Sequence, residues 1–373
     1  MAAGSQAVTN TEKCAAHKKT TTTALSQQYG GKHTGRWVSR LPESWIPYVQ
    51  LARLSPPAGL ALIYFPHLFG ALLAAILKDA PPMELLRACM VLLPWSLFFS
   101  NAAHAWNDLA DAPLDALVAR TQQRPIPRGA VSSRGAAIFA ASQAILGVAV
   151  LRLGIPGRAA ESASHYILPN ALATLYYPYA KRHTHLAQFV LGSCLAWGVI
   201  VGCVAMNYEP FAIEPFLTMP TTASPAWSPF PSVRVSPPVV YLVLACVCWT
   251  AIYDSIYAHQ DLVDDKRLGL RSMAVLLGDR YTKPGLSVLL CGQLALLVAC
   301  GASSEGIWPY YTIIATSGCA ISLGCMIAFV KLKDSGSCWW WFGHGFWTAG
   351  FSITGALAAE YFGRRLSLHQ LWP

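Results

Sequence analysis

Two groups of acidic residues stand out because acids are scarce in this sequence. Asp and Glu account for 18 of the 373 residues, yet seven of them fall within two short segments. The groups consist of Asp108, Asp111 and Asp115, and of Asp254, Asp261, Asp264 and Asp265. Each group lies where an apolar run meets a basic loop, so we expect the two groups to share one side of the structure.

The spacing within each group is that of one helical face. Asn107, Asp111 and Asp115 are four residues apart, which stacks an amide and two carboxylates on the same face. The same periodicity runs through Asp254, Tyr257, Asp261 and the pair Asp264 and Asp265. Two facing rows of carboxylates repel each other unless cations lie between them. Oxygen ligands without His or Cys favour Mg²⁺ or Ca²⁺ over zinc.

A phosphate compound is the expected ligand of such a metal site. Mg²⁺ usually binds one or two protein carboxylates and completes its coordination with water and phosphate oxygens. Basic side chains that could hold the remaining phosphate oxygens are Arg120, Arg124, Lys181 and Arg182. The alternative is that the acids are solvated ends of membrane helices. That alternative accounts for one acidic group well but for two matched groups poorly.

The elements that position these groups are apolar segments long enough to cross a bilayer. Hydrophobic residues make up 54% of the chain and charged residues only 12%, against roughly 25% charged in soluble domains. The apolar residues form runs of about twenty. We therefore predict an all-α membrane protein with about nine transmembrane helices bundled around a central cavity. These helices are expected near 56–77, 84–106, 135–154, 163–180, 185–206, 237–258, 284–303, 307–331 and 342–363.

The distribution of Lys and Arg supports this topology. Of the 27 basic residues, 20 fall in the N-terminal segment and in the loops after the second, fourth, sixth and eighth predicted helices. Such asymmetry is typical of the cytoplasmic or matrix side of a membrane protein. The formal charge of +9 therefore reflects topology, and we expect the lipid bilayer rather than nucleic acid as a partner.

Three regions follow from this pattern. Residues 1–47 are predicted to be a disordered or targeting tail, residues 48–363 the membrane domain, and residues 364–373 a short C-terminal tail. Residues 1–40 contain six basic residues and one acid, Glu12, which fits either a disordered segment or a transit peptide. The Pro-rich segment 207–236 is predicted to be a loop on the side opposite the acidic groups.

Three motifs resemble those of the UbiA superfamily of membrane prenyltransferases. The first is Asn107-Asp-Leu-Ala-Asp111-Ala-Pro-Leu-Asp115, followed by Arg120-Thr-Gln-Gln-Arg124-Pro-Ile-Pro-Arg-Gly129. The second is Tyr177-Pro-Tyr-Ala-Lys181-Arg182, and the third is Asp254-Ser-Ile-Tyr257-Ala-His-Gln-Asp261-Leu-Val-Asp264-Asp265. The resemblance covers about residues 48–363. It is strongest to 4-hydroxybenzoate polyprenyltransferases and to fungal prenyltransferases of meroterpenoid pathways, although Ala110 and Ser255 depart from the usual Trp and Thr.

The resemblance implies Mg²⁺-dependent transfer of a prenyl group from an isoprenoid diphosphate to a ring carbon of an aromatic acceptor. Implied metal ligands are Asp108, Asp111, Asp115, Asp261, Asp264 and Asp265, and implied diphosphate contacts are Arg120, Arg124, Lys181 and Arg182. Implied catalytic and cation-shielding residues are Asn107, Asp254, Tyr257, Tyr177 and Tyr253, with Arg53 as a candidate acceptor contact. His104 and His259 flank the motifs and are more typical of packed, hydrogen-bonded residues than of catalysts.

Several functions stay open. The favoured one is farnesylation of a phenolic polyketide for a meroterpenoid in the endoplasmic reticulum, and the alternative is 4-hydroxybenzoate polyprenylation in the mitochondrial inner membrane. Another alternative keeps the same fold but has a different role: haem farnesylation, attachment of the chlorophyll or menaquinone side chain, or a nonenzymatic scaffold role in lipid biosynthesis. A secondary transporter is the rival from another class, because charged residues also line transporter cavities. The oligomeric state is left open.

Overall fold

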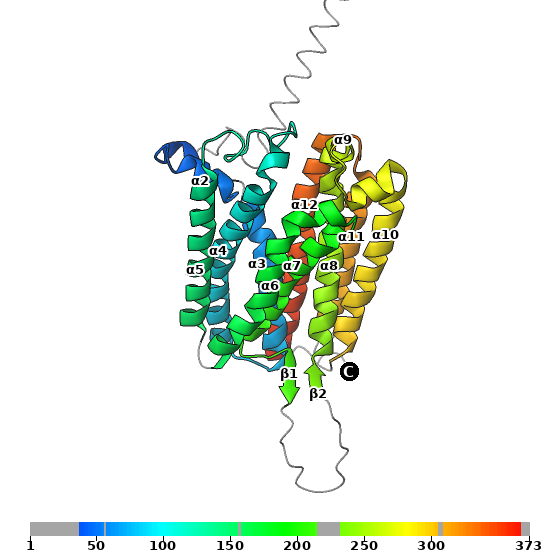
Figure 1. Ribbon diagram of the computed structural model, residues 1–373. Coiled ribbons are helices and arrows are strands. Elements are labelled where there is room, and N and C mark those ends of the chain that lie inside the picture. Colours follow the sequence, from blue (N-terminus) through cyan, green and yellow to red (C-terminus); the bar gives the residue numbers. More distant parts are fainter. Residues whose placement is uncertain (1–36, 56, 156–157, 215–231, 305–308, 367–373) are drawn as a thin grey trace, which may run out of the picture.

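The protein is a bundle of long helices standing side by side (Figure 1). The computed structural model describes residues 37–55, 57–155, 158–214, 232–304 and 309–366. Its helices are η1 (Val38–Arg40), α2 (Ile46–Leu51), α3 (Ala58–Leu77), α4 (Pro82–Asp115), α5 (Ser133–Gly154), α6 (Arg158–His183), α7 (Ala187–Ala205), α8 (Pro237–Ala258), η2 (His259–Asp261), α9 (Leu262–Arg267), α10 (Met273–Ala302), α11 (Tyr310–Phe329) and α12 (Ser335–Arg365).

The predicted all-α membrane fold is confirmed. In the part of the chain that the structure describes, nine helices have 19 or more residues, and each overlaps one of the segments predicted from the sequence. Seven helices are long and apolar enough to cross a membrane. The other two long helices, α6 and α12, are less apolar, so the number of nine spans stays a prediction. The chain is an integral membrane protein.

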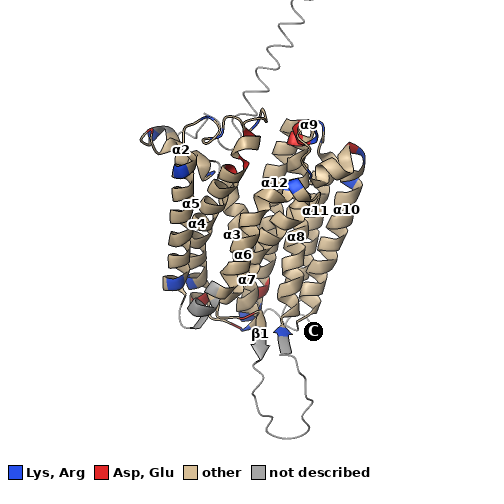
Figure 2. Ribbon diagram, viewed as in Figure 1, with Lys and Arg blue, Asp and Glu red and all other residues tan. Residues whose placement is uncertain are grey.

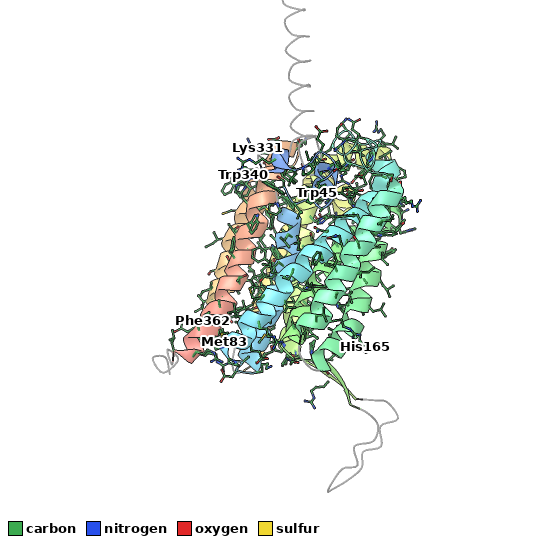
Figure 3. All side chains as sticks on the ribbon, turned by 90° about the vertical axis from the view of Figure 1, so that its left-hand side faces the viewer. Trp45, Met83, His165, Lys331, Trp340 and Phe362 are labelled. Carbon is green, nitrogen blue, oxygen red and sulfur yellow. The ribbon has the colours of Figure 1, made fainter. Side chains whose placement is uncertain are left out.

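Successive long helices alternate in direction along the bundle. Trp45, Lys331 and Trp340 lie at one end, and Met83 and Phe362 lie at the other (Figure 3). We call the first of these the carboxylate end, because α4 and α8 both finish there and α9 follows (Figure 1). Helix α12, the last described helix, runs to the opposite end, where Phe362 lies, as the alternation predicts (Figure 3).

A short hairpin extends from the end opposite the carboxylate end. Strands β1 (Phe211–Glu214) and β2 (Ser232–Val235) pair antiparallel, so the segment predicted as a loop over 207–236 is partly a two-stranded sheet. The base of the hairpin is held by Ser236 N, which donates to Pro210 O at 2.9 Å. Residues 215–231 lie outside the described residues, and so do residues 1–36 of the predicted tail 1–47 and residues 367–373 of the predicted tail 364–373.

Small residues let α3 and α7 approach each other closely. A Cβ at Gly202 would lie 2.8 Å from the backbone nitrogen of Ala71, and one at Gly198 would lie 2.8 Å from His67 Nδ1. The His67 ring links α3 to α4, because its Nε2 accepts a hydrogen bond from Trp95 Nε1 at 2.7 Å. Close backbone approach and buried polar links of this kind stabilise helix packing in membranes, where lipid removes the usual hydrophobic drive.

The last helix closes the bundle against the first long one. Helix α12 packs on α3, with the Phe65 ring of α3 against Trp347 and Phe351 of α12. Tyr361 Oη donates to Ala80 O at 2.7 Å, just beyond the end of α3. Helices from opposite ends of the sequence therefore form one wall.

Candidate active site

The fold brings the two acidic groups together at the carboxylate end. Figure 2 shows acidic residues at the end of α4 and in α9. The first group occupies the last turns of α4, and the second runs from α8 through η2 into α9. Helix α9 ends at Arg267, and Gly269 follows two residues later with a φ of 68°, the left-handed conformation that glycine adopts at low cost. The turn that follows is fixed to α6 by Arg271 N, which donates to Lys181 O at 2.8 Å.

A cavity of about 200 Å³ lies between the two groups. Thirteen of the sixteen predicted site residues line it, and they come from both acidic groups, the loop after α4, α6, and the turn before α3. These residues are Arg53, Asn107, Asp111, Asp115, Arg120, Arg124, Tyr177, Lys181, Tyr253, Asp254, Tyr257, Asp261 and Asp265. The residues predicted from helical spacing, charge and motif resemblance therefore mostly share one cavity.

The other three predicted residues lie outside the lining. Asp108 is buried behind it, where it accepts from Arg53 Nη2 at 2.8 Å and from Arg124 Nη1 at 3.1 Å. Asp264 pairs instead with Arg267 at 3.2 Å, and the exposed Arg182 donates to Ala110 O at 3.3 Å. In these positions the three side chains contact residues next to the cavity rather than the cavity itself. Their predicted roles as metal or phosphate ligands stay predictions.

Two arginines from the loop after α4 each pair with one of the acidic groups, Arg120 with the second group and Arg124 with the first. Arg120 donates from Nε and Nη2 to the two carboxylate oxygens of Asp261, at 2.8 and 2.5 Å, and from Nη1 to Tyr257 Oη at 2.8 Å. Arg124 Nη1 donates to Asp115 Oδ2 at 2.7 Å. Burial lowers the pKa of a guanidinium, but the carboxylates beside it outweigh burial, so the pKa values of both arginines lie above their ordinary range. Both side chains stay charged.

The remaining oxygen atoms suit a hard divalent cation. Asp265 is only 3% exposed, and among the described residues its Oδ2 has no hydrogen-bond partner. Asn107 Nδ2 donates to Asp111 Oδ2 at 3.3 Å, which leaves the amide oxygen of Asn107 as an acceptor. A buried carboxylate oxygen without a partner costs free energy unless a cation binds it. The donor set therefore fits Mg²⁺.

A metal at this site needs ligands beyond the protein. Within the described ranges, no cluster of three or more His, Cys, Asp or Glu side chains has the geometry to hold a metal. The cavity is lined by five carboxylates and by four cationic side chains, from Arg53, Arg120, Arg124 and Lys181. Such a mixed lining favours a cation and an anion together, as in a metal-bound phosphate compound.

Comparison with known proteins assigns the family. Residues 63–350 match the model of the UbiA prenyltransferase family. The chain belongs to this family. It is therefore a transferase of prenyl groups, and the predicted family and enzyme class are confirmed.

Two relatives are similar to this chain over most of its length. The mitochondrial 4-hydroxybenzoate polyprenyltransferase of Saccharomyces cerevisiae is 32% identical over 327 residues, which cover 88% of this chain and 79% of that protein. Polyprenyl transferase andD of Emericella variicolor is 32% identical over 281 residues, covering 74% of this chain and 76% of the relative. The chain is a UbiA-family aromatic prenyltransferase.

A solved structure shows the same fold. A UbiA homologue from Archaeoglobus fulgidus, bound to GPP and Mg²⁺, has a TM-score of 0.57 at 16% identity. The match covers 85% of this chain and 99% of the homologue. A prenyl diphosphate and a divalent cation are thus bound by a protein of this architecture.

Sequence reasoning did not place His104, Thr174 or Phe342 in the site, although all three line the cavity. His104 lies one helical turn before Asn107, and Thr174 one turn before Tyr177, so each extends a face that the motifs already defined. Continuing the helical periodicity one turn deeper would have found both. Phe342 reaches the cavity from α12, and no local pattern in the sequence predicts that contact.

Proposed function

We propose that this enzyme transfers a farnesyl group from farnesyl diphosphate to a ring carbon of a phenolic polyketide, as a step of meroterpenoid biosynthesis. The observation that carries the proposal is the single cavity lined by five carboxylates, four cationic side chains and a tyrosine wall. Similarity to polyprenyl transferase andD supports the pathway. The departures at Ala110 and Ser255 support an acceptor other than that of the quinone enzymes.

The acidic groups would hold the metal. The proposed ligands are Asn107, Asp111, Asp115, Asp261 and Asp265, with Asp108 and Asp264 adding negative charge around them. Mg²⁺ bound there supplies the positive charge that makes the diphosphate a good leaving group. Arg120, Arg124 and Lys181 then stabilise the charge that develops on the departing diphosphate, while Arg182 lies at the rim.

The aromatic side of the cavity would protect the allylic cation. The Tyr257 and Phe342 rings are 4.7 Å apart between centroids, and Tyr253 and Phe342 are 5.8 Å apart. Their π faces, with that of Tyr177, stabilise positive charge and exclude water that would convert the cation to an alcohol.

Bond making and breaking balance within this cavity. The donor C–O bond breaks and its electron pair leaves with the diphosphate. A ring carbon of the acceptor supplies the pair for the new C–C bond and then loses its proton. Asp254 lines the cavity and is the proposed base for that proton, which restores aromaticity. Arg53 is the proposed contact for an acceptor carboxylate.

A second function is favoured by a specific observation. The yeast 4-hydroxybenzoate polyprenyltransferase matches over 88% of this chain, which supports ubiquinone synthesis in the mitochondrial inner membrane. The farnesyl proposal places the enzyme in the endoplasmic reticulum.

The deciding experiment is an assay on membranes from cells that express the protein. Mg²⁺ and farnesyl or longer diphosphates are supplied with orsellinate-type phenols or with 4-hydroxybenzoate, and products are identified by mass. A farnesylated polyketide phenol supports the first function. A product from 4-hydroxybenzoate alone, formed faster with longer donors, overturns it in favour of the second. Substrate accumulation without any covalent product contradicts both and indicates transport.

A further inference from the structure

The cavity continues one helical turn below the carboxylates, between α4 and α6. These two helices lie side by side with the same direction, because Trp106 Nε1 donates to Leu175 O at 3.0 Å and Arg182 Nη2 to Ala110 O at 3.3 Å. His104 and Thr174 both line the cavity, and this alignment places them at similar depth. We call this part of the cavity the lower chamber.

The lining of the lower chamber is mostly apolar; besides these two side chains and the Cys194 thiol, the charged groups of Arg53 and Asp108 lie near His104. Its other lining residues are Leu62, Ile63, Phe99, Ala103, Leu191 and Leu195. In such surroundings a polar atom without a partner is costly. Two polar atoms in a mostly apolar chamber therefore suit an occupant that is largely apolar but carries hydrogen-bonding groups.

Thr174 presents an unsatisfied hydroxyl to the chamber. Its Oγ1 is buried and, apart from the weakly hydrogen-bonding thiol of Cys194, has no partner among the described residues. A hydroxyl on α6 could instead have bonded to a backbone carbonyl of its own helix, as Ser and Thr commonly do. Thr174 is thus available to a ligand.

His104 presents a hydrogen-bond acceptor. Its Nδ1 lies 2.8 Å from Ser100 O, a carbonyl that can only accept, so Nδ1 carries the proton and Nε2 keeps its lone pair. Gly59 fixes the ring from the other side, because a Cβ there would lie 2.8 Å from His104 Nε2.

We propose that His104 and Thr174 form the hydroxyl-recognising subsite for the aromatic acceptor. His104 Nε2 accepts a phenolic O–H, and Thr174 Oγ1 bonds a second oxygen of the ring substituents. An isoprenoid chain has no group that could satisfy either atom, so the lower chamber holds the acceptor. This inference rests on the proposed aromatic prenyl transfer and names the residues that recognise the hydroxyl of the acceptor.

The test compares each phenolic acceptor with its methyl ether, using full-length protein in membranes with Mg²⁺ and farnesyl diphosphate. The wild-type ratio of kcat/KM for phenol over ether is compared with the ratios of Thr174→Val and His104→Leu. Loss of one hydrogen bond is expected to lower the ratio about tenfold in each variant. The KM for farnesyl diphosphate is expected to stay unchanged. His104→Gln, whose amide oxygen can accept the same bond, is expected to restore part of the ratio.

Thr312→Val is the matched control. Thr312 is 5% exposed and also has an unpartnered hydroxyl among the described residues, but it lies on α11, away from the cavity. Its ratio is expected to equal that of wild type. Active His104 and Thr174 variants that keep the wild-type ratio overturn this inference alone. A wild-type enzyme that prenylates no phenol overturns the proposed function and this inference with it.

Discussion

Arg120 and Asp261 form a two-point ion pair that joins the two acidic groups across 141 residues of sequence. Arg120 Nε and Nη2 each donate to a different oxygen of the Asp261 carboxylate, and Nη1 is left to bond Tyr257 Oη. One guanidinium thus sets the distance between the loop after α4 and η2. The spacing of the proposed metal ligands depends on that distance.

Arg120→Lys is expected to lower kcat/KM by about 100-fold, because an ammonium cannot make the planar two-point contact or keep the bond to Tyr257. Initial rates per amount of inserted protein measure the effect. Arg267→Lys is the control, since Arg267 is exposed and pairs with Asp264 outside the cavity. A rate for Arg120→Lys equal to that of the control would show that the pair is dispensable.

Asp265→Asn is expected to lower turnover by about 1000-fold and to raise the Mg²⁺ concentration needed for half-maximal rate, because it removes the charge of a buried ligand while keeping its shape. A Mg²⁺ titration of the rate measures both quantities. Asp279→Asn serves as the comparison, because Asp279 is half-exposed and lies 3.8 Å from Lys333. An unchanged Mg²⁺ dependence in Asp265→Asn would remove Asp265 from the metal site.

Substitutions of Tyr257 separate its hydroxyl from its ring. Tyr257→Phe loses the bond to Arg120 but keeps the π face, so a rate loss of about tenfold is expected. Tyr257→Leu also loses the π face, and we expect more of the donor to end as prenyl alcohol. The ratio of prenylated product to alcohol, measured by mass, distinguishes the two. Equal ratios in the two variants would contradict a role of the ring in shielding the cation.

Gly202→Ala is expected to destabilise the protein by about 1–3 kcal/mol, because its Cβ would strike the α3 backbone. Gly292→Ala on α10 is the matched control: its Cβ would meet nothing within 4 Å, and replacing a helical glycine favours the helix. Thermal unfolding in detergent is the measurement. Destabilisation by Gly292→Ala as large as that by Gly202→Ala would show that close packing of α3 on α7 is not the cause.

Local periodicity predicted much of the fold and of the site. Apolar runs located the long helices, and helical spacing identified Asp111, Asp115 and Asn107 as one face. Asp108 is not on that face, because it is one position from Asn107 and so points about 100° away around α4; its role as a metal ligand came from the resemblance and stays a prediction. Its neighbours Arg53 and Arg124 decide its position, and both come from other segments.

Features that depend on tertiary contacts escaped prediction. Helix α10 begins at Met273, before the predicted start at 284, because the chain continues helically on both sides of Gly278, whose φ is 59°. The Pro-rich composition of 207–236 concealed the pairing of Phe211 with Val235. Such pairing depends on a partner strand and leaves only a weak pattern in a short segment.

The closure of α12 against α3 has a consequence for how the enzyme is made in the cell. Tyr361 and Ala80 are 281 residues apart. Helix α3 can therefore complete its packing against α12 only after almost the whole chain has been synthesised. The carboxylates, arginines and tyrosines of the cavity are all translated before Phe342, which completes its aromatic side. A nascent or truncated chain lacking α12 would therefore have the proposed diphosphate-binding groups but not the full wall that excludes water. We expect such a chain to hydrolyse the donor rather than transfer its prenyl group.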